Sequence, residues 1–219
     1  MTHAAELQTL ASALGADVSI EGAEALLAYL DAMLDENQRI NLTAVRERQA
    51  AVMLHALDSL ALGACELGAG GPESAPLQAL DLGTGNGFPG VAIACLFPNA
   101  AICLMDRRLK KLHAILRCLG TAGFDVERFE ILHMDAAAAT SEGHANRFDL
   151  ITTRAVGPPE SVGKLAKPLL APDGRFIAWL SDETDAPARL KCGLSLVHSV
   201  EYDLPAPANR ARRIAVYSR

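Results

Sequence analysis

The chain has 219 residues, of which 50% are hydrophobic and 21% charged, with a formal net charge of −6 at pH 7. This composition is typical of a globular protein and excludes a disordered chain or a bulk nucleic-acid coating protein. The five cysteines are scattered without a C-x-x-C pair, so we expect buried thiols in a reducing compartment and no metal site. Without a visible leader or bilayer-length apolar run, we expect a cytoplasmic protein with no membrane partner.

The N-terminal part of the chain is predicted to be helical. Apolar residues recur at helical spacing over residues 4–14 and 21–36, and a third helix is expected over residues 47–62. We therefore assign residues 1–65 to an N-terminal helical region. Residues 66–76 are rich in glycine and proline, which predicts a linker.

Polar residues stand out at several places in this helical part. Ser19 is a candidate N-cap of the second helix. Asn41 and Thr43 follow that helix, and His55 and Asp58 are three residues apart on one face of the third. Two interpretations remain open: the last four are local caps and a satisfied polar pair, or they lie at the mouth of a functional site.

The stretch over residues 79–90, A-L-D-L-G-T-G-N-G-F-P-G, combines a buried strand, a glycine-rich turn and the start of a helix. Glycines let the backbone turn sharply and let a ligand approach with no Cβ in the way. The literal G-x-G-x-x-G pattern over residues 85–90 fits a dinucleotide site, and a NAD-dependent oxidoreductase is one alternative. However, Asp81 would repel a pyrophosphate, and Pro89 lacks an N–H group that a pyrophosphate would use. Both residues argue against a dinucleotide, and Asp81 would not repel a cationic ligand.

From residue 77 onward, the predicted strands and helices alternate. Strands are expected at residues 77–82, 101–105, 129–133, 149–153 and 176–180, and helices at 90–96, 107–119 and 160–170, with a turn at 172–174. This alternation predicts a Rossmann-like α/β fold with a mostly parallel sheet over residues 77–219. Two further strands, at 194–202 and 213–217, follow without a helix between them, which predicts an antiparallel addition.

Three candidate site residues follow predicted strands. Asp106 ends the second strand, where an acidic residue bonds ribose hydroxyls in doubly wound sheets, and a helix N-cap is the alternative. Asp135 follows the third strand, where a group could meet an adenine, and an ordinary loop residue is the alternative. Arg154 follows the fourth strand, and its planar donors suit a phosphate, a cofactor or a base.

Basic residues cluster in two short windows, on either side of residue 110 and at the C-terminus. Such clustering on an acidic chain is typical of a protein that binds a phosphate backbone. The alternative is a solvated helix face and a basic terminus. The predicted RNA contacts are Arg107, Arg108, Lys110, Lys111, Arg210, Arg212 and Arg213.

Six motifs occur in the order I-N-L-T-A, H-A-L-D-S-L, L-D-L-G-T-G-N-G-F-P-G, M-D-R-R-L-K-K, I-T-T-R-A and L-A-K-P-L-L-A-P-D-G-R. In sequence and spacing, the chain over residues 25–219 closely resembles the glucose-inhibited division protein B (RsmG) family. This resemblance implies a bacterial class I methyltransferase that uses S-adenosyl-L-methionine (AdoMet). It implies methylation of N7 of a guanine in a hairpin loop of 16S ribosomal RNA near the decoding site, with 16S rRNA and the small ribosomal subunit as partners.

The resemblance also implies roles for residues at matching positions. Gly83 and Phe88 would line the AdoMet pocket, Asp106 would face the ribose, the 136–137 backbone the adenine, and Arg154 the cofactor or the target base. The chain departs from the family at the alanine-rich segment after Asp135 and at Val156, where the family has an aromatic residue. The predicted cofactor-binding residues are Asp81, Gly83, Gly85, Gly87, Phe88, Asp106, Asp135, Ala136, Ala137 and Arg154.

Guanine N7 has an available lone pair, so the implied methyl transfer needs no general base. The protein then has to align N7, the methyl carbon and the sulfur and to exclude water, and the base has to leave its stack. Arg154 is the predicted catalytic residue. We expect the protein to be a monomer. A non-catalytic AdoMet-binding, RNA-associated protein is a second alternative.

Overall fold

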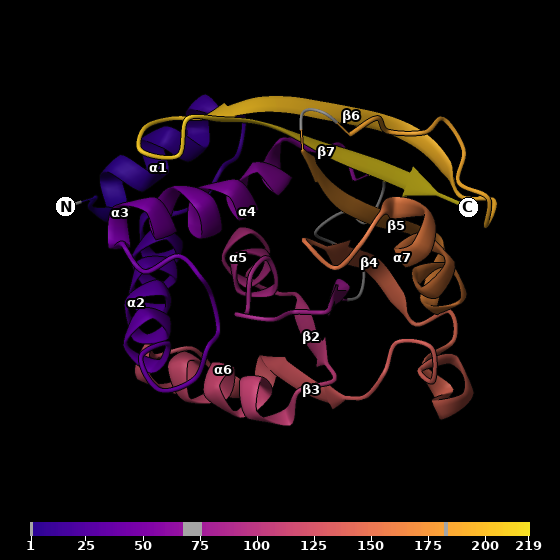
Figure 1. The fold of residues 1–219 in the computed structure, drawn as a ribbon, viewed down its shortest axis with the longest axis horizontal. Helices are drawn as coiled ribbons and strands as arrows, with labels where there is room; N and C mark the ends of the chain where they lie inside the picture. Colours follow the sequence, from indigo (N-terminus) through magenta and orange to yellow (C-terminus); the bar gives the residue numbers. More distant parts are fainter. Residues whose placement is uncertain (1, 68–75, 182–183) are drawn as a thin grey trace.

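The structure of the chain is a computed structural model that describes residues 2–67, 76–181 and 184–219. These residues contain a seven-stranded sheet in the order β3-β2-β1-β4-β5-β7-β6 (Figure 1). The strands are β1 (Gln78–Leu82), β2 (Ala101–Asp106), β3 (Phe129–His133), β4 (Phe148–Thr153), β5 (Leu170–Ser181), β6 (Ser195–Leu204) and β7 (Arg210–Ser218). The predicted Rossmann-like α/β class is confirmed.

Five strands of this sheet are parallel and two are antiparallel additions. β1 pairs in parallel with β2 and β4, while β3 and β5 extend the sheet on either side. β7 runs antiparallel to both β5 and β6, as predicted. Because parallel strands end at the same edge, the glycine turn after β1, Asp106 at the end of β2 and Arg154 after β4 share one edge of the sheet.

Helices cover both faces of the sheet (Figure 1). The α-helices outside the third predicted helix are α1 (Ala4–Ala13), α2 (Ile20–Glu36), α5 (Gly90–Leu96), α6 (Leu109–Thr121) and α7 (Pro159–Ala166). Short helical turns are η3 (Val126–Arg128), η4 (Thr140–His144) and η5 (Lys167–Leu169). Ser19 caps α2, since its side chain accepts a hydrogen bond from the N–H of Gly22 at 3.0 Å. None of the described helices is long and apolar enough to cross a membrane.

The third predicted helix is a continuous helical stretch that changes its winding along its length. It begins as α3 (Arg48–Ala51), continues as the π-helical η1 (Val52–Leu57) and α4 (Asp58–Leu60), and ends as the 3₁₀ turn η2 (Ala61–Ala64). We call residues 48–64 the winding stretch. π-Helical turns are uncommon and occur often at functional sites.

The N-terminal helices share one hydrophobic core with α5 and α6 on one face of the sheet, while α7 packs on the other. Leu26 and Leu30 from α2 pack in the same cluster as Ile93 and Ile115. Most of the predicted linker falls on residues 68–75, which lie outside the described residues, and the domain boundaries stay predictions. All five cysteines are free thiols; four are buried, and Cys192 is half-buried.

Two local predictions are wrong at element boundaries. α6 begins at Leu109 and not at residue 107, because the Asp106 carboxylate accepts a hydrogen bond from the N–H of Arg108 at 2.8 Å, and Arg108 has extended backbone angles. The helix also continues past its predicted end at residue 119, through Gly120 to Thr121.

The turn predicted at residues 172–174 lies within the bounds of β5, and the pairing with β4 is irregular there. Phe148 is opposite Leu170, but Leu150 is opposite Arg175, so the intervening residues of β5 bulge out. Gly174 permits this approach, because a Cβ at this residue would lie 2.9 Å from the carbonyl oxygen of Phe148.

Candidate active site

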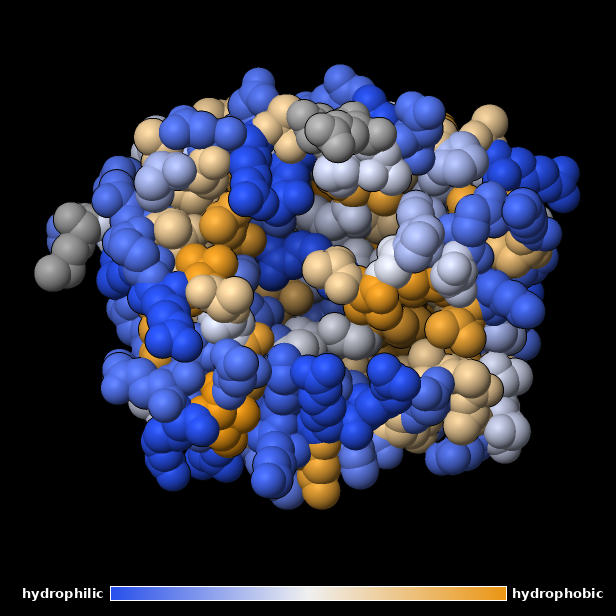
Figure 2. Space-filling model, viewed as in Figure 1, coloured by the Kyte–Doolittle hydropathy of each residue, from blue (hydrophilic) through white to orange (hydrophobic). Residues whose placement is uncertain are grey.

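A cavity of about 480 Å³ lies beside the glycine turn at the carboxyl edge of the parallel strands. Its walls come from the loop before the winding stretch, the winding stretch itself, the glycine turn, the end of β4, β5 and β7. In Figure 2, which has the view of Figure 1, the molecule is hollowed near its centre, and hydrophobic residues lie beside the hollow. The cavity therefore brings together segments that are far apart in the sequence.

The glycine turn is held from below by Asp81, at the end of β1. This carboxylate is buried and accepts hydrogen bonds from the hydroxyl of Thr84 at 2.7 Å and the N–H of Gly90 at 3.0 Å. Burial raises the pKa of Asp81 to about 6, although these two hydrogen bonds and Arg154 oppose the shift. Asp81 does not line the cavity. The Asp81 carboxylate, predicted to lie beside the turn, therefore fixes the shape of the turn from its buried side.

Three glycines of the turn have left-handed backbone angles, and each has a different space around it. At Gly87, with φ +91°, an added Cβ would collide with the hydroxyl of Tyr29. At Gly83, with φ +77°, it would lie 2.5 Å from the side chain of Val156. At Gly85, with φ +59°, the nearest atom would be a backbone oxygen 3.7 Å away. Gly85 also lines the cavity, so it is here that a ligand can approach the backbone.

Tyr29, which the sequence did not single out, sets the position of the turn from the helical side. Its ring is completely buried, its hydroxyl donates to the carbonyl oxygen of Asn86 at 2.9 Å, and it packs edge-on against Phe88 with ring centroids 5.5 Å apart. Phe88 in turn stacks on His55 of the winding stretch. The aromatic contacts therefore connect the glycine turn to two N-terminal helices.

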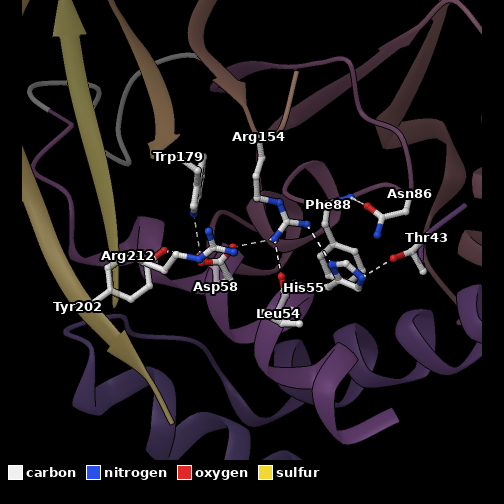
Figure 3. A network of polar contacts seen from close by, with 10 residues as sticks. All are labelled: Thr43, Leu54, His55, Asp58, Asn86, Phe88, Arg154, Trp179, Tyr202 and Arg212. Carbon is white, nitrogen blue, oxygen red and sulfur yellow. Dashed lines mark hydrogen bonds and ion pairs between the residues drawn. The ribbon is translucent and has the colours of Figure 1, made fainter. Parts of the chain in front are cut away.

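Arg154 extends from the end of β4 to the winding stretch (Figure 3). One terminal nitrogen donates to the carbonyl oxygen of Leu54 at 2.8 Å and to the carboxylate of Asp58 at 3.0 Å. The other lies 3.4 Å from Nδ1 of His55. Only 12% of the Arg154 side chain is exposed. These contacts hold the guanidinium group in one orientation at the cavity wall.

His55 is a neutral member of this network. Burial and the positive charge of Arg154 lower the pKa of His55 to about 3. A neutral imidazole can accept a hydrogen bond from Arg154 at Nδ1 and donate at Nε2 to the hydroxyl of Thr43, which is 2.9 Å away. His55 therefore positions Arg154 and the loop at Thr43. Because its imidazole is neutral, it is not a general acid at neutral pH.

Asp58 contacts side chains from three strands and from the loop after β4. Besides Arg154, its carboxylate accepts a hydrogen bond from the hydroxyl of Tyr202 on β6 at 2.7 Å and lies 3.5 Å from Nε of Arg212 on β7. Its backbone oxygen accepts from the indole N–H of Trp179 on β5 at 2.9 Å. His55 and Asp58 both line the cavity and are joined through Arg154. Both residues are satisfied, as one of the two interpretations predicted, but by Arg154 and not by each other.

Asp106 and Asp135 lie on the other side of the glycine turn and do not line the cavity. One carboxylate oxygen of Asp106 accepts from the N–H of Gly85 at 3.1 Å and the other from the N–H of Arg108. Asp106 is therefore not the N-cap of α6, a position that Arg108 takes. Asp135 accepts from the N–H of Ala137 at 3.0 Å and forms an exposed ion pair with Arg107 at 3.5 Å.

The predicted RNA contacts near residue 110 differ in their exposure to solvent. Arg107, Arg108 and Lys110 are exposed at the start of α6, and Lys111 is half-buried with its ammonium group 3.4 Å from the carbonyl oxygen of Leu42. Burial and the charge of Arg108 lower the pKa of Lys111.

The three predicted RNA-binding arginines of β7 do not all point to the same face of the sheet. Arg210 and Arg212 line the cavity, whereas Arg213 alternates to the other face of β7 and donates to Glu201. Trp179, also a cavity residue, was missed because a tryptophan in an apolar strand is typical of an ordinary core residue.

A family model described as GidB, rRNA small subunit methyltransferase G, matches residues 22–198. The chain belongs to this family. Two relatives named ribosomal RNA small subunit methyltransferase G are similar over most of their length. The one from Leptothrix cholodnii is 35% identical over 196 residues, 89% of this chain and 86% of its own. The one from Geobacter sulfurreducens is 34% identical over 209 residues, 91% of this chain and 90% of its own. The resemblance drawn from the six motifs is confirmed.

Solved structures with the same fold are more distant in sequence. MtNAS in complex with MTA and tNA has a TM-score of 0.55 at 12% identity, over 99% of this chain and 75% of its own. A predicted O-methyltransferase, protein Atu636 from Agrobacterium tumefaciens, has a TM-score of 0.52 at 19% identity, over 65% of this chain and 74% of its own. These similarities concern the fold alone.

Proposed function

We propose that the chain transfers a methyl group from AdoMet to N7 of a guanine in 16S rRNA. The observation that carries the proposal is the open space above Gly85, at a cavity beside the glycine turn, in a member of the rRNA small subunit methyltransferase G family. The relatives' names refer to ribosomal RNA of the small subunit. Our proposal adds to these names that the methyl acceptor is N7 of a guanine and that the methyl donor is AdoMet.

The residues around the turn fit AdoMet. Among the described residues, no side chain lies within 4 Å of the position that a Cβ on Gly85 would take. The Asp106 carboxylate is bonded to the Gly85 N–H, so an acceptor for ribose hydroxyls lies next to the open backbone. Arg154 has no described partner at Nε, and Nε–H and the adjacent terminal N–H form a fork that suits a carboxylate. When bound, AdoMet would supply an electrophilic methyl group.

The cavity suits a reaction that needs no general base. His55 is neutral with both ring nitrogens engaged, and the Asp58 carboxylate is engaged by Arg154 and Tyr202. Neither has to remove a proton, because guanine N7 attacks through its own lone pair. The role of Arg154 is to orient the reactants, while apolar cavity residues exclude water; they are Leu42, Val45, Leu54 and Phe88.

The start of α6 is the proposed RNA face outside the cavity. Figure 2 shows hydrophilic residues over α6 below the central hollow. The four basic residues there follow β2 directly, so they lie at the same sheet edge as the glycine turn; they are Arg107, Arg108, Lys110 and Lys111. In this proposal, they hold RNA phosphates while the target guanine enters the cavity.

The proposal is tested by mapping N7-methylguanosine in ribosomal RNA from cells with and without the protein. We expect one guanine of 16S rRNA to lose its methyl group without the protein, and to regain it when purified protein and AdoMet are added. An unchanged methylation map would overturn the proposal. Binding calorimetry with AdoMet and NAD separates the alternatives, because NAD binding without AdoMet binding indicates an oxidoreductase.

A matched pair of glycine variants tests the cofactor position. Gly85 and Gly123 both have left-handed backbone angles and no close neighbours for an added Cβ, but only Gly85 lines the cavity. Gly85→Val and Gly123→Val should therefore share the backbone strain, and only Gly85→Val should abolish AdoMet binding. Equal AdoMet affinities of the two variants would contradict the assignment.

A further inference from the structure

We propose that Arg210 and Arg212 form an anion subsite in the cavity, and that it binds the phosphate of the target guanosine nucleotide. The choice of nucleotide rests on the proposed function. The subsite itself rests on the geometry of β7 and on the charges that line the cavity.

The charge of the cavity is positive. Among its described lining residues, there are three arginines and one carboxylate, that of Asp58. Arg154 and Tyr202 already bond this carboxylate at 3.0 and 2.7 Å. One carboxylate offsets one of the three arginine charges, so two positive charges remain in excess. Apolar walls strengthen the attraction of such charges for an anion, since the walls keep solvent away.

Strand geometry places Arg210 and Arg212 together. They are two residues apart on β7, so their side chains leave the same face of the sheet, roughly 7 Å apart at the Cα atoms. Arg212 is opposite Tyr202 on β6 and Ser181 on β5. Arg213 has the opposite orientation, and Glu201 accepts from its Nε at 3.0 Å. Two guanidinium groups on one face can hold one phosphate.

Arg212 has donors that no described residue satisfies. Its Nε is buried without a hydrogen-bond partner among the described residues, because Asp58 lies only at ion-pair distance, 3.5 Å. No described residue accepts from its terminal nitrogens either, and 22% of the side chain is exposed. An arginine at a cavity wall whose N–H donors have no partner in the protein can donate them to an acceptor group of a ligand.

A nucleotide phosphate fits this subsite better than the carboxylate of the cofactor. In Figure 3, Arg154 lies nearer Phe88 of the glycine turn than Arg212 does, and Arg154 carries the fork that suits a carboxylate. Arg210 and Arg212 come from β7. A guanosine that leaves its stack brings a phosphate with it. A cavity of about 480 Å³ is in the size range of small-molecule sites.

The experiment uses the only tryptophan of the chain, Trp179, which lines the same cavity, as a fluorescent reporter. The full chain is titrated with GMP and with guanosine, which lacks the phosphate. We expect GMP to bind about tenfold more tightly than guanosine, because of the charge-assisted hydrogen bonds. Equal affinities, or no response to millimolar GMP, would overturn the subsite.

Arg212→Ala should remove the preference for GMP, and the matched control Arg213→Ala, on the other face of β7, should keep it. Arg212→Gln preserves more of the side-chain packing and serves if the alanine variant does not fold. AdoMet affinity, measured in parallel, should not change in either Arg212 variant. A loss of AdoMet affinity equal to the loss of GMP affinity would place the cofactor carboxylate at Arg212 and overturn the proposal.

The two proposals fail separately. If the wild-type chain does not methylate rRNA but its preference for GMP disappears in Arg212→Ala, the proposed function is wrong and the anion subsite stands. If the chain methylates rRNA and Arg212→Ala keeps the preference for GMP, the subsite is wrong and the function stands.

Discussion

The two sides of the glycine turn are built in different ways. On the side of β2 and β3, Asp106 and Asp135 each accept from a backbone N–H two residues further along the chain. On the cavity side, Asp58 is joined to Arg154 and Tyr202, which are 96 and 144 residues away. The first side consists mainly of local turns, and the second joins the N-terminal helices to the end of the sheet.

The difference in burial decides what each set of charges contributes. The pair of Arg107 and Asp135 has side-chain exposures of 75% and 52%, so water screens it. Asp58 is 1% exposed and Arg154 12% exposed, so neither charge has water to replace a lost partner. The cavity side should therefore depend strongly on each member of its network, while the other side should tolerate changes.

The largest expected effect is on stability at Asp58. Asp58→Ala leaves the largely buried charge of Arg154 without its carboxylate, so we expect the free energy of unfolding to fall by about 3–5 kcal/mol. Asp135→Ala, which breaks the exposed pair, should cost less than about 1 kcal/mol. Urea denaturation of both variants checks this contrast. Similar losses for the two variants would show that the comparison is wrong.

The next effect concerns AdoMet affinity at Asp106. Asp106→Ala should weaken AdoMet binding by about 1–3 kcal/mol if the carboxylate bonds the ribose. Asp125 is a matched control, because it also accepts from the N–H two residues further along the chain, at 3.1 Å, whereas only Asp106 also accepts from the N–H of Gly85 in the glycine turn. Calorimetry on Asp125→Ala should show no loss of affinity. If Asp106→Ala only lowers the melting temperature, Asp106 has a structural role alone.

A pH-dependent effect is expected at His55. Its folded pKa of about 3 is below the unfolded value of 6.5, so the unfolded state takes up the proton as the pH falls. Its contribution to stability is complete above pH 6.5 and is lost toward pH 3, by at most about 1.4 kcal/mol per pH unit. Asp81, with a folded pKa raised to about 6, has the opposite slope between about pH 4 and 6.

The comparison of wild type with His55→Asn separates these two groups, because Asp81 is present in both proteins. We expect the difference in their free energies of unfolding to shrink between pH 7 and pH 5 in thermal or urea denaturation. A difference that stays constant with pH would indicate that folding does not lower the pKa of His55.

The smallest effect is expected at the exposed basic residues just before and at the start of α6. Replacing Arg107 and Lys110 by alanine should leave AdoMet affinity intact and flatten the salt dependence of RNA binding by about 0.7–0.9 per lost phosphate contact. Arg117→Ala is the control on the same helix, because Arg117 forms an ion pair with Glu36. An equal change of slope in Arg117→Ala would indicate that only the net charge matters.

Much of the fold could be predicted from the sequence, because its signals are local. The period of apolar residues predicted α1, α2 and every strand of the sheet, and the glycine pattern predicted the turn after β1. The errors were at boundaries, such as the start of α6 and the bulge in β5, where a side-chain bond to Arg108 and a close approach to Phe148 decide the backbone.

The partners of the polar residues required the tertiary structure. A spacing of three residues predicted that His55 and Asp58 share a helix face, yet the helix is π-wound up to Leu57, and Arg154 bonds both residues from the end of β4. Nothing local in the sequence indicates that winding, or that Asp58 meets Arg212. The sequence by itself determined the sheet, the glycine turn and the family, since these follow from periodicity and motifs. The buried charge network was decided by folding, because partners far apart in the chain meet only when the N-terminal helices pack against the sheet.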